Sequence, residues 1–205
     1  EEGYRSGIEP VLLAAAIPAR PGDRVLEAGA GAGAGLMCLA ARVPGITGVG
    51  VELDPAMAEV ARTNIAANAL PGLEILTGDI RTLSLGTFDH AFANPPWHDA
   101  RSTPSPVDRR RAAKQAASGE LEAWTEALRR ALRPDGTLTL ILPAQTAARL
   151  GAPTMQLLPK AGRRAKLSLV RVAGNLAAEP VVLHQESGAY TPEIEVVLRD
   201  GAALL

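Results

Sequence analysis

The sequence contains few of the residues that stabilise disulfide-rich or metal-dependent proteins. Cys38 is its one cysteine, which excludes an internal disulfide and a zinc site with four thiolate ligands. His90, His98 and His184 show no metal-ligand spacing among themselves, so no metal is expected. Aromatic residues are scarce, with two each of Trp, Tyr and Phe. The core must therefore be packed mainly by Ala, Leu, Val and Gly.

Neither sign of charge is in excess, since 21 Lys and Arg stand beside 22 Asp and Glu. This balance excludes a polycationic arm or an acidic tail as the dominant feature of the chain. A nucleic-acid partner would therefore have to bind to a local basic patch. The charge-free stretch at residues 28–41 is too short and too rich in Gly to span a bilayer, and no signal peptide opens the chain. We therefore expect a cytoplasmic protein without a membrane partner.

Strand-like and helix-like segments alternate through the first 150 residues. Short apolar segments indicate strands at 24–27, 46–52, 73–76, 88–93 and 137–142. Helical signals lie between them, such as Asp54-Pro55, which pairs an N-cap residue with proline in the first turn. This alternation predicts an α/β fold of the Rossmann-like, doubly wound type, with a mostly parallel sheet and helices on both faces.

The last third of the chain has a different pattern. Residues 165–173, 180–184 and 193–199 indicate three strands without helices between them. We therefore expect an antiparallel C-terminal edge on the parallel sheet. An Arg-Pro-Asp-Gly string at 133–136 predicts a turn before the last parallel strand. Trp124 lies on the apolar stripe of the helix that precedes this turn, and we expect it in the core.

A length of 205 residues favours a single domain over residues 1–205, because domains commonly run to about 100–200 residues. Within it, residues 1–22 are expected to form an N-terminal helix and turn. Residues 98–117 form the one long irregular stretch, rich in Pro, Ser, Thr and Arg, which we interpret as a basic substrate loop.

The first predicted strand runs into a glycine-rich loop that opens a helix. The loop places Gly29, Ala30, Gly31 and Gly33 directly after the acidic Glu27. Glycines let the backbone approach a ligand closely, and a helix N-terminus offers free N–H groups. Ligands bind at this end of the first strand in open α/β sheets. By itself the loop could also be a tight turn that packs helix on strand.

Acidic residues end the next two strands. Glu52 follows the second strand, 23 residues after Gly29, where a carboxylate suits a ribose diol; Asp79 follows the third, where it can accept from an adenine amino group. The spacing Gly29-x-Gly31-x-x-Ala34 also matches a nicotinamide-dinucleotide fingerprint. Glu27 would repel a pyrophosphate but would attract the cationic amino-acid part of S-adenosylmethionine. The ordered acids therefore favour S-adenosylmethionine as the cofactor.

The fourth predicted strand ends in the string Asn94-Pro95-Pro96-Trp97. The two prolines remove backbone donors, which leaves the Asn94 side-chain oxygen and the Pro95 carbonyl as acceptors. A planar NH₂ group can donate to both acceptors while Trp97 stacks on its ring. Such a string can also be a plain turn, but its place beside the cofactor loop favours methyl transfer to an amine.

With these motifs the chain resembles the class I S-adenosylmethionine-dependent methyltransferases, in the branch that methylates planar NH₂ groups. The resemblance covers nearly the whole chain. It implies that Asn94, Pro95, Pro96 and Trp97 receive the target amine. It also implies a set of cofactor-binding residues, namely Glu27, Gly29, Ala30, Gly31, Gly33, Glu52, Leu53, Asp79, Ile80 and Asn94, with Arg5 as a further contributor.

Further segments favour one branch of these enzymes. The opening residues 3–14, the Thr103-Pro104 pair with its following arginines, and the tail around Tyr190-Thr191 resemble the bacterial tRNA(Val) adenine-N6 methyltransferase family. That family modifies the adenosine 3′ of the anticodon. Trp97 stands where Tyr or Phe is commoner, and His98 resembles a residue of guanine-N2 enzymes. Guanine-N2 methylation of rRNA and N5 methylation of a protein glutamine therefore stay open, while a nicotinamide oxidoreductase and a non-catalytic RNA-binding module are disfavoured.

Basic residues support an RNA substrate. One cluster follows the acceptor motif directly and is expected to contact tRNA; it comprises Arg101, Arg109, Arg110, Arg111 and Lys114. A second cluster comprises Arg163, Arg164 and Lys166. Contacts of these groups with phosphates would make binding depend on salt. A merely solvated charged loop is the alternative interpretation, and the oligomeric state is not predicted.

Overall fold

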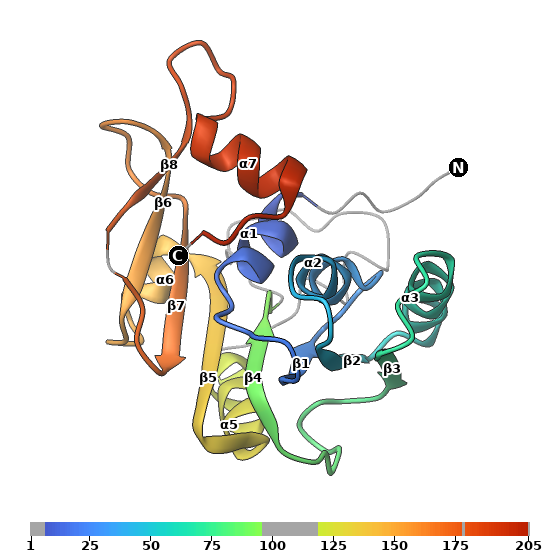
Figure 1. Cartoon of the computed structure of the whole chain (residues 1–205). Helices are drawn as coiled ribbons and strands as arrows, with labels where there is room; N and C mark the ends of the chain where they lie inside the picture. Colours follow the sequence, from blue (N-terminus) through green and yellow to red (C-terminus); the bar gives the residue numbers. More distant parts are fainter. Residues whose placement is uncertain (1–6, 96–118, 178, 205) are drawn as a thin grey trace.

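The computed structural model describes residues 7–95, 119–177 and 179–204, which build one eight-stranded sheet with helices on both faces (Figure 1). The strands are β1 (Arg24–Ala28), β2 (Thr47–Glu52), β3 (Leu73–Thr77), β4 (Phe88–Ala93), β5 (Leu132–Pro143), β6 (Thr154–Lys160), β7 (Leu167–Ala173) and β8 (Val181–His184). The helices are α1 (Glu9–Ala15), α2 (Ala34–Arg42), α3 (Pro55–Ala67), α5 (Glu120–Arg130), α6 (Ala144–Ala147) and α7 (Pro192–Asp200).

The strand order β3-β2-β1-β4-β5-β7-β6-β8 confirms the expected fold class. The first five strands in this order run parallel to one another, whereas β7 is antiparallel to both β5 and β6. The chain order reverses between β1 and β4, so these neighbours form the topological switch point where open α/β sheets bind ligands. We call the edge at which the parallel strands end the carboxyl edge, and the opposite one the amino edge.

Side chains alternate between two cores along each central strand. In β1, Val25 packs into the core beneath α1, α2, α3 and α7, whereas Leu26 and Ala28 pack into the core beneath α5 and α6. In β4, Phe92 faces the first core and Ala91 the second. This period of two explains why nearly continuous apolar runs such as residues 88–93 form strands buried on both faces.

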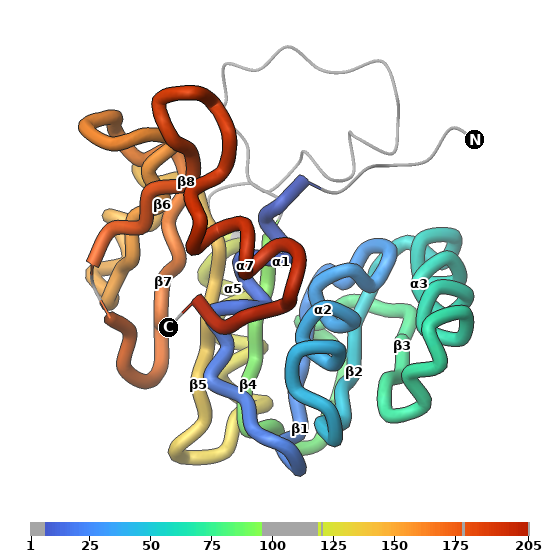
Figure 2. Tube along the Cα trace, turned by 45° about the horizontal axis from the view of Figure 1, so that its top comes forward, coloured from blue at the N-terminus to red at the C-terminus, as the bar shows by residue number. Residues whose placement is uncertain are grey.

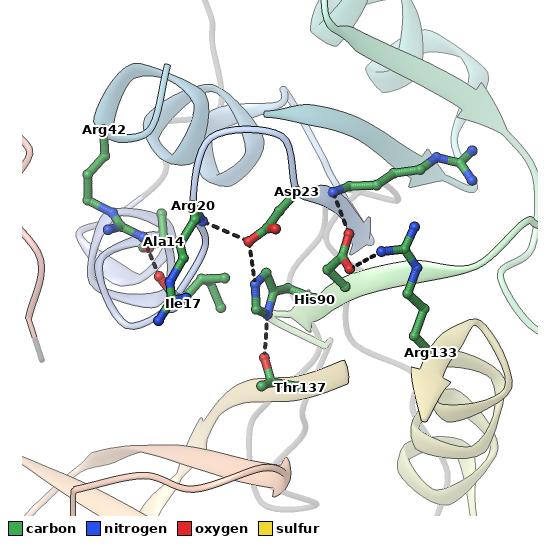
Figure 3. A network of polar contacts seen from close by, with 10 residues as sticks. Ala14, Ile17, Arg20, Asp23, Arg42, His90, Arg133 and Thr137 are labelled. Carbon is green, nitrogen blue, oxygen red and sulfur yellow. Dashed lines mark hydrogen bonds and ion pairs between the residues drawn. The ribbon is translucent and has the colours of Figure 1, made fainter. Parts of the chain in front are cut away.

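A polar network ties the strands together at the amino edge, away from the carboxyl ends (Figure 3). The ring of His90 lies between Thr137 Oγ1 at 2.8 Å and Asp23 Oδ2 at 3.0 Å. Asp89 accepts a hydrogen bond from Arg133. Burial is the main cause that lowers the pKa of His90. His90 thus has a structural role, because it links the beginning of β4 to β5 and to the residue before β1.

Two arginines from distant elements hold the C-terminal end of α1. Arg42 Nη2 donates to the carbonyls of Ala14 and Ile17, as Figure 3 shows. Arg171, which is 2% exposed, donates through Nη2 to Ala16 O at 2.7 Å. Because helix ends leave carbonyls unpaired, these guanidinium groups supply the missing donors. Arg171 also ties β7 to the N-terminal helix.

The structure corrects the expectation of a strand at 193–199, because Pro192–Asp200 is the helix α7. Alternating Glu and apolar residues at its start imitate the period of a strand. The helix is selected instead by proline in its first turn, by Gly201 with φ +66° at its end, and by Ile194 and Val197, which are buried on one side. The antiparallel edge is built by β7 and by β6, which the sequence analysis missed.

The predicted turn at 133–136 is part of the long strand β5 and needs a second correction. Leu132 pairs with Phe88, and the next pair along is Thr137 with His90. Four residues of β5 therefore stand opposite the single residue Asp89, so the Pro-Gly string makes a bulge inside the strand instead of ending one.

Candidate cofactor and acceptor site

Glu27 is a buried acid at the end of β1, facing the start of α2. Its side chain is 4% exposed, and its Oε2 accepts from Leu36 N at 2.8 Å. A Cβ on Gly35 would lie 2.2 Å from Glu27 Oε1, so glycine at this position gives the carboxyl its room. Within the described part of the chain, Oε1 accepts no hydrogen bond. The free oxygen is thus available to a ligand donor.

Burial raises the pKa of Glu27 to about 8, since desolvation disfavours its charged form. The hydrogen bond from Leu36 lowers the pKa, and the nearby charge of Glu52 raises it by a smaller amount. Without a cation beside it, this carboxyl is mostly neutral at pH 7. A ligand ammonium at Oε1 would favour the ionised form.

The loop from Gly29 to Gly33 is held against the end of β2 by its own backbone. Gly29 N and Ala30 N both donate to Val51 O, at 2.8 and 3.0 Å, and Gly31 N donates to Glu52 Oε2 at 2.8 Å. Three of its glycines have left-handed φ angles, between +54° and +84°. Other residues adopt this conformation only at a cost, which is the physical reason for the glycines here.

Glu52 and Leu53 present a polar and an apolar group side by side at the end of β2. Glu52 Oε1 accepts from Asp54 N at 2.9 Å, so backbone donors orient both of its oxygens. Each carboxylate oxygen has a further lone pair for a ligand hydroxyl. Leu53 is 65% exposed, which leaves a large apolar side chain uncovered at this edge.

The third strand ends at the same edge, where Gly78 N donates to Glu52 O at 2.9 Å. The Asp79 carboxylate accepts from Arg81 through its backbone N, Nε and Nη2, at 2.5 to 2.9 Å. This pairing is the main cause that lowers the pKa of Asp79. Ile80 is buried in the second core. The structure thus adds Arg81, which the sequence analysis did not single out, as the partner of the expected adenine acceptor.

Asn94 and Pro95 lie at the switch point, directly beside the glycine loop. The last paired residues of β1 and β4 are Ala28 and Ala93, so Gly29 and Asn94 leave the sheet from adjacent strands. Asn94 is half-buried and Pro95 is buried. The donor loop and the acceptor motif therefore begin about one strand spacing, roughly 4.8 Å, apart.

The remaining expected site residues lie outside the described residues. These are Pro96 and Trp97 of the acceptor motif, Arg5, and the basic cluster of Arg101, Arg109, Arg110, Arg111 and Lys114. Their assigned roles stay predictions. Among the residues that the structure describes, no group of three or more His, Cys, Asp or Glu side chains could hold a metal ion, and no helix is long and apolar enough to cross a membrane.

Trp124 reaches the glycine loop as well as the core. Its ring is partly buried against the second core, as expected. Its Cη2 atom also lies 2.9 Å from the position of a Cβ on Gly29. No motif in the sequence signals this contact, because it joins α5 to a loop almost 100 residues earlier. The indole therefore lies behind the backbone from which the cofactor loop begins.

Comparison with known proteins agrees with this arrangement. The profile of the methyltransferase small domain family matches residues 9–149. A tRNA1(Val) (adenine(37)-N6)-methyltransferase of Porphyromonas gingivalis (strain ATCC 33277) is 30% identical over 92% of this chain and 85% of its own. The enzyme of the same name from Yersinia enterocolitica is 26% identical over 95% of this chain and 84% of its own.

Solved structures show the same fold. A predicted O-methyltransferase, Atu636 from Agrobacterium tumefaciens, superposes with a TM-score of 0.75 at 25% identity, over 95% of this chain and 97% of its own. TrmN from Thermus thermophilus has a TM-score of 0.50 at 22% identity, over 75% of this chain and 44% of its own. The chain belongs to the methyltransferase small domain family and is an S-adenosylmethionine-dependent methyltransferase.

Proposed function

We propose that this protein transfers a methyl group from S-adenosylmethionine to the N6 amino group of an adenine in tRNA, with the adenosine 3′ of the anticodon in tRNA(Val) as its target. The names of relatives that align with more than nine-tenths of the chain support this substrate. The Asn-Pro-Pro-Trp motif supports an exocyclic amine as the acceptor. A tRNA substrate also supports activity in the cytoplasm.

The residues at the carboxyl edge fit this cofactor. Glu27 Oε1, a free acceptor at a buried site, suits the methionine ammonium group, and Glu52 suits the ribose diol. The exposed Leu53 would lie against the adenine ring, with Ile80 beneath it and Asp79 toward its amino group. Gly29, Ala30, Gly31 and Gly33 would form the wall of backbone around the methionine part. Arg5 would contribute from the N-terminal segment.

The acceptor motif would hold and orient the target amine. The Asn94 side-chain oxygen and the Pro95 carbonyl accept its two N–H groups, and Trp97 stacks on the base while Pro96 fixes the backbone between them. When bound, the cofactor supplies an electrophilic methyl group. The two acceptors stabilise the positive charge that develops on the amine nitrogen. The methylated nitrogen is then acidic enough to lose its proton to water, so the chain needs no general base.

One observation carries the proposal: the pairing of Ala28 with Ala93 joins the donor loop and the acceptor motif at the switch point. A base in an anticodon loop is out of reach of this junction while it is stacked. It must be turned out of its stack to enter, which costs least in a single-stranded loop.

The test is to incubate the protein with methyl-labelled S-adenosylmethionine and total small RNA, and then to identify the labelled nucleoside after digestion. The proposal expects N6-methyladenosine in the tRNA fraction. Label in N2-methylguanosine would reassign the substrate to a guanine. No label in RNA, although the protein binds S-adenosylmethionine, would refute the proposal and make a protein glutamine the next acceptor to test.

A further inference from the structure

The turn between β6 and β7 carries three cationic side chains that no part of the site described above uses. We call residues 161–166 the basic turn; its cations are Arg163, Arg164 and Lys166. All three side chains are exposed. They form no ion pair and no side-chain hydrogen bond with the rest of the described chain. Their charges are therefore available to a partner outside the described chain.

The fold places this turn at the carboxyl edge. Leu167, the first residue of β7, pairs with Pro143, the last residue of β5. The backbone is fixed there, because Ala144 N donates to Lys166 O at 3.0 Å. Figures 1 and 2 both show the β6–β7 connection on the side of the molecule toward which β4 and β5 point. The basic turn and the acceptor motif therefore share one edge.

The distance between them follows from the strand pairing. From β4 to β6 there are three strand steps, in the order β4-β5-β7-β6. Three steps of about 4.8 Å give roughly 14 Å across the sheet. Pro143 lies three residues beyond Leu140, the partner of Ala93, which adds about 10 Å along the strands. The base of the turn, where β7 begins, thus lies about 17 Å from the start of the acceptor motif, a span of about five nucleotides in a stacked strand at 3.4 Å each. Arg163 and Arg164 lie farther out, because β6 continues to Lys160 beyond the pair of Leu157 with Leu167.

Local charge favours an anion at this corner of the molecule. Arg149, two residues after α6, is exposed. The acid on the adjoining segment between β8 and α7 is Glu186, and Glu193 follows in the first turn of α7. Lys160 Nζ donates to the Glu186 carbonyl at 2.9 Å. Cations outnumber acids here although the whole chain is nearly neutral. Arginine forks match phosphate oxygens, which carry the negative charge of an RNA strand.

We propose that the basic turn binds phosphates of the tRNA substrate, at least about five nucleotides from the base that enters the acceptor motif. The turn extends the RNA-binding surface across the antiparallel edge of the sheet. This inference rests on the proposed function, since it takes the RNA whose base is methylated as the partner. Its contacts are electrostatic, so they add affinity and salt dependence without reading sequence.

The experiment compares two variants with the same loss of charge. Arg163→Gln with Arg164→Gln removes two cations from the basic turn. Arg20→Gln with Arg130→Gln removes two exposed arginines near the amino edge and serves as the control. Binding to a fluorescent tRNA(Val) transcript is measured by anisotropy between 50 and about 300 mM salt, where each lost phosphate contact flattens the slope of log K against log salt by about 0.7–0.9.

The turn variant is expected to flatten this slope by about 1–2 and to weaken tRNA binding about tenfold near 150 mM salt, whereas the control matches the parent protein. Its KM for tRNA rises while kcat stays within about twofold, and its affinity for S-adenosylhomocysteine and its melting temperature stay unchanged. Equal slopes for the turn variant and the control would overturn the inference.

Binding is measured without turnover, so the proposed methyl acceptor and the proposed role of the basic turn can be refuted independently of each other. A parent protein that labels N6-adenine in tRNA, with equal slopes for both variants, refutes the basic turn alone. In the opposite case, the parent protein labels no tRNA, but tRNA affinity falls in the turn variant and not in the control. That result would refute the proposed acceptor and support the turn as an RNA-binding surface.

Discussion

Glu27 meets two opposing requirements. A buried carboxyl whose pKa rises to about 8 stabilises the fold while neutral, but a cationic ligand needs it ionised. The native state therefore binds a proton that the unfolded chain releases at a lower pH. The contribution of this proton to the unfolding free energy is fully present below the ordinary glutamate pKa of 4.5, and it is lost as the pH rises through about 8.

Replacing Glu27 by Gln is expected to remove this pH dependence. Between about pH 5 and pH 8 the unfolding free energy of the parent protein falls relative to that of the variant. The variant is therefore most stable relative to the parent protein at alkaline pH. Its affinity for S-adenosylmethionine falls at least about tenfold, because the partner of the ammonium group is gone. Urea unfolding at pH 6 and 8.5 and calorimetric titration check both effects. Glu74→Gln, on an exposed strand position, is the control. Parallel pH curves for the parent and Glu27→Gln would contradict the assignment.

Asn94 is expected to act on turnover much more than on cofactor binding. Asn94→Ala removes the side-chain acceptor that we propose orients the amine and stabilises its developing charge, so kcat should fall by about 10²–10³. The affinity for S-adenosylhomocysteine should stay within about threefold. Single-turnover kinetics and calorimetry separate the two quantities. An equal loss of both would show that Asn94 has a structural role instead.

At the scale of elements, α5 and the glycine loop touch through Trp124. Gly29 and Gly31 both have left-handed backbones, but only a Cβ at Gly29 would meet the indole. Gly31→Ala should cost about 1–2 kcal/mol of unfolding free energy from backbone strain alone. Gly29→Ala should cost about 1–3 kcal/mol more because it also overpacks the contact.

Repeating both alanine substitutions in a Trp124→Leu background tests whether the extra cost at Gly29 comes from the indole. Shortening the side chain should remove most of the difference between the two alanine variants, as a double-mutant cycle by urea unfolding would measure. A difference that survives in the Trp124→Leu background would mean that the indole does not restrict the loop.

The segment after the acceptor motif is the second element with a testable role. Arg109→Ala combined with Arg110→Ala is expected to weaken tRNA binding and to flatten its salt slope, because both cations follow the motif that we propose receives the base. Anisotropy titrations at several salt concentrations measure both. An unchanged slope would remove this cluster from the RNA-binding surface.

Elements whose own residues carry a clear pattern could be predicted from the sequence, whereas an element selected by packing against distant residues could not. The strands β1, β2 and β4 are buried on both faces, so their apolar runs were visible, whereas the edge strand β3 shows an alternation of buried and exposed residues. The Gly, Glu and Asn residues at the strand ends were expected at one edge. The helix α7 could not be read from its residues, because the packing of Ile194 and Val197 against distant elements selects its period. The strand β6 carried a visible alternation in Met155 and Leu157 that was missed.

Side-chain pairings across the fold were beyond sequence reasoning. The contact of Trp124 with Gly29 depends on how the chain closes in three dimensions, because the two residues lie far apart in the sequence. The pairing of Asp79 with Arg81 is local, but no motif in the sequence singled out Arg81. The buried position of Glu27 was implied by its strand, but its pKa depends on the close approach of α2 that Gly35 permits.

At the scale of the whole molecule, the family match ends near α6, while β6, β7, β8 and α7 follow it. This last part is integral to the fold, because β7 pairs with β5 and Arg171 holds α1. It also carries the basic turn. The molecule thus combines a donor and acceptor junction at the switch point with a C-terminal edge available for substrate contact.

The most direct test of the central claim uses two tRNA(Val) transcripts that differ in one nucleotide. One has adenosine 3′ of the anticodon, and the other has guanosine there. We expect one N6-methyladenosine per molecule in the first transcript and none in the second. Methyl transfer to the second transcript, or to a guanine in either one, would contradict it.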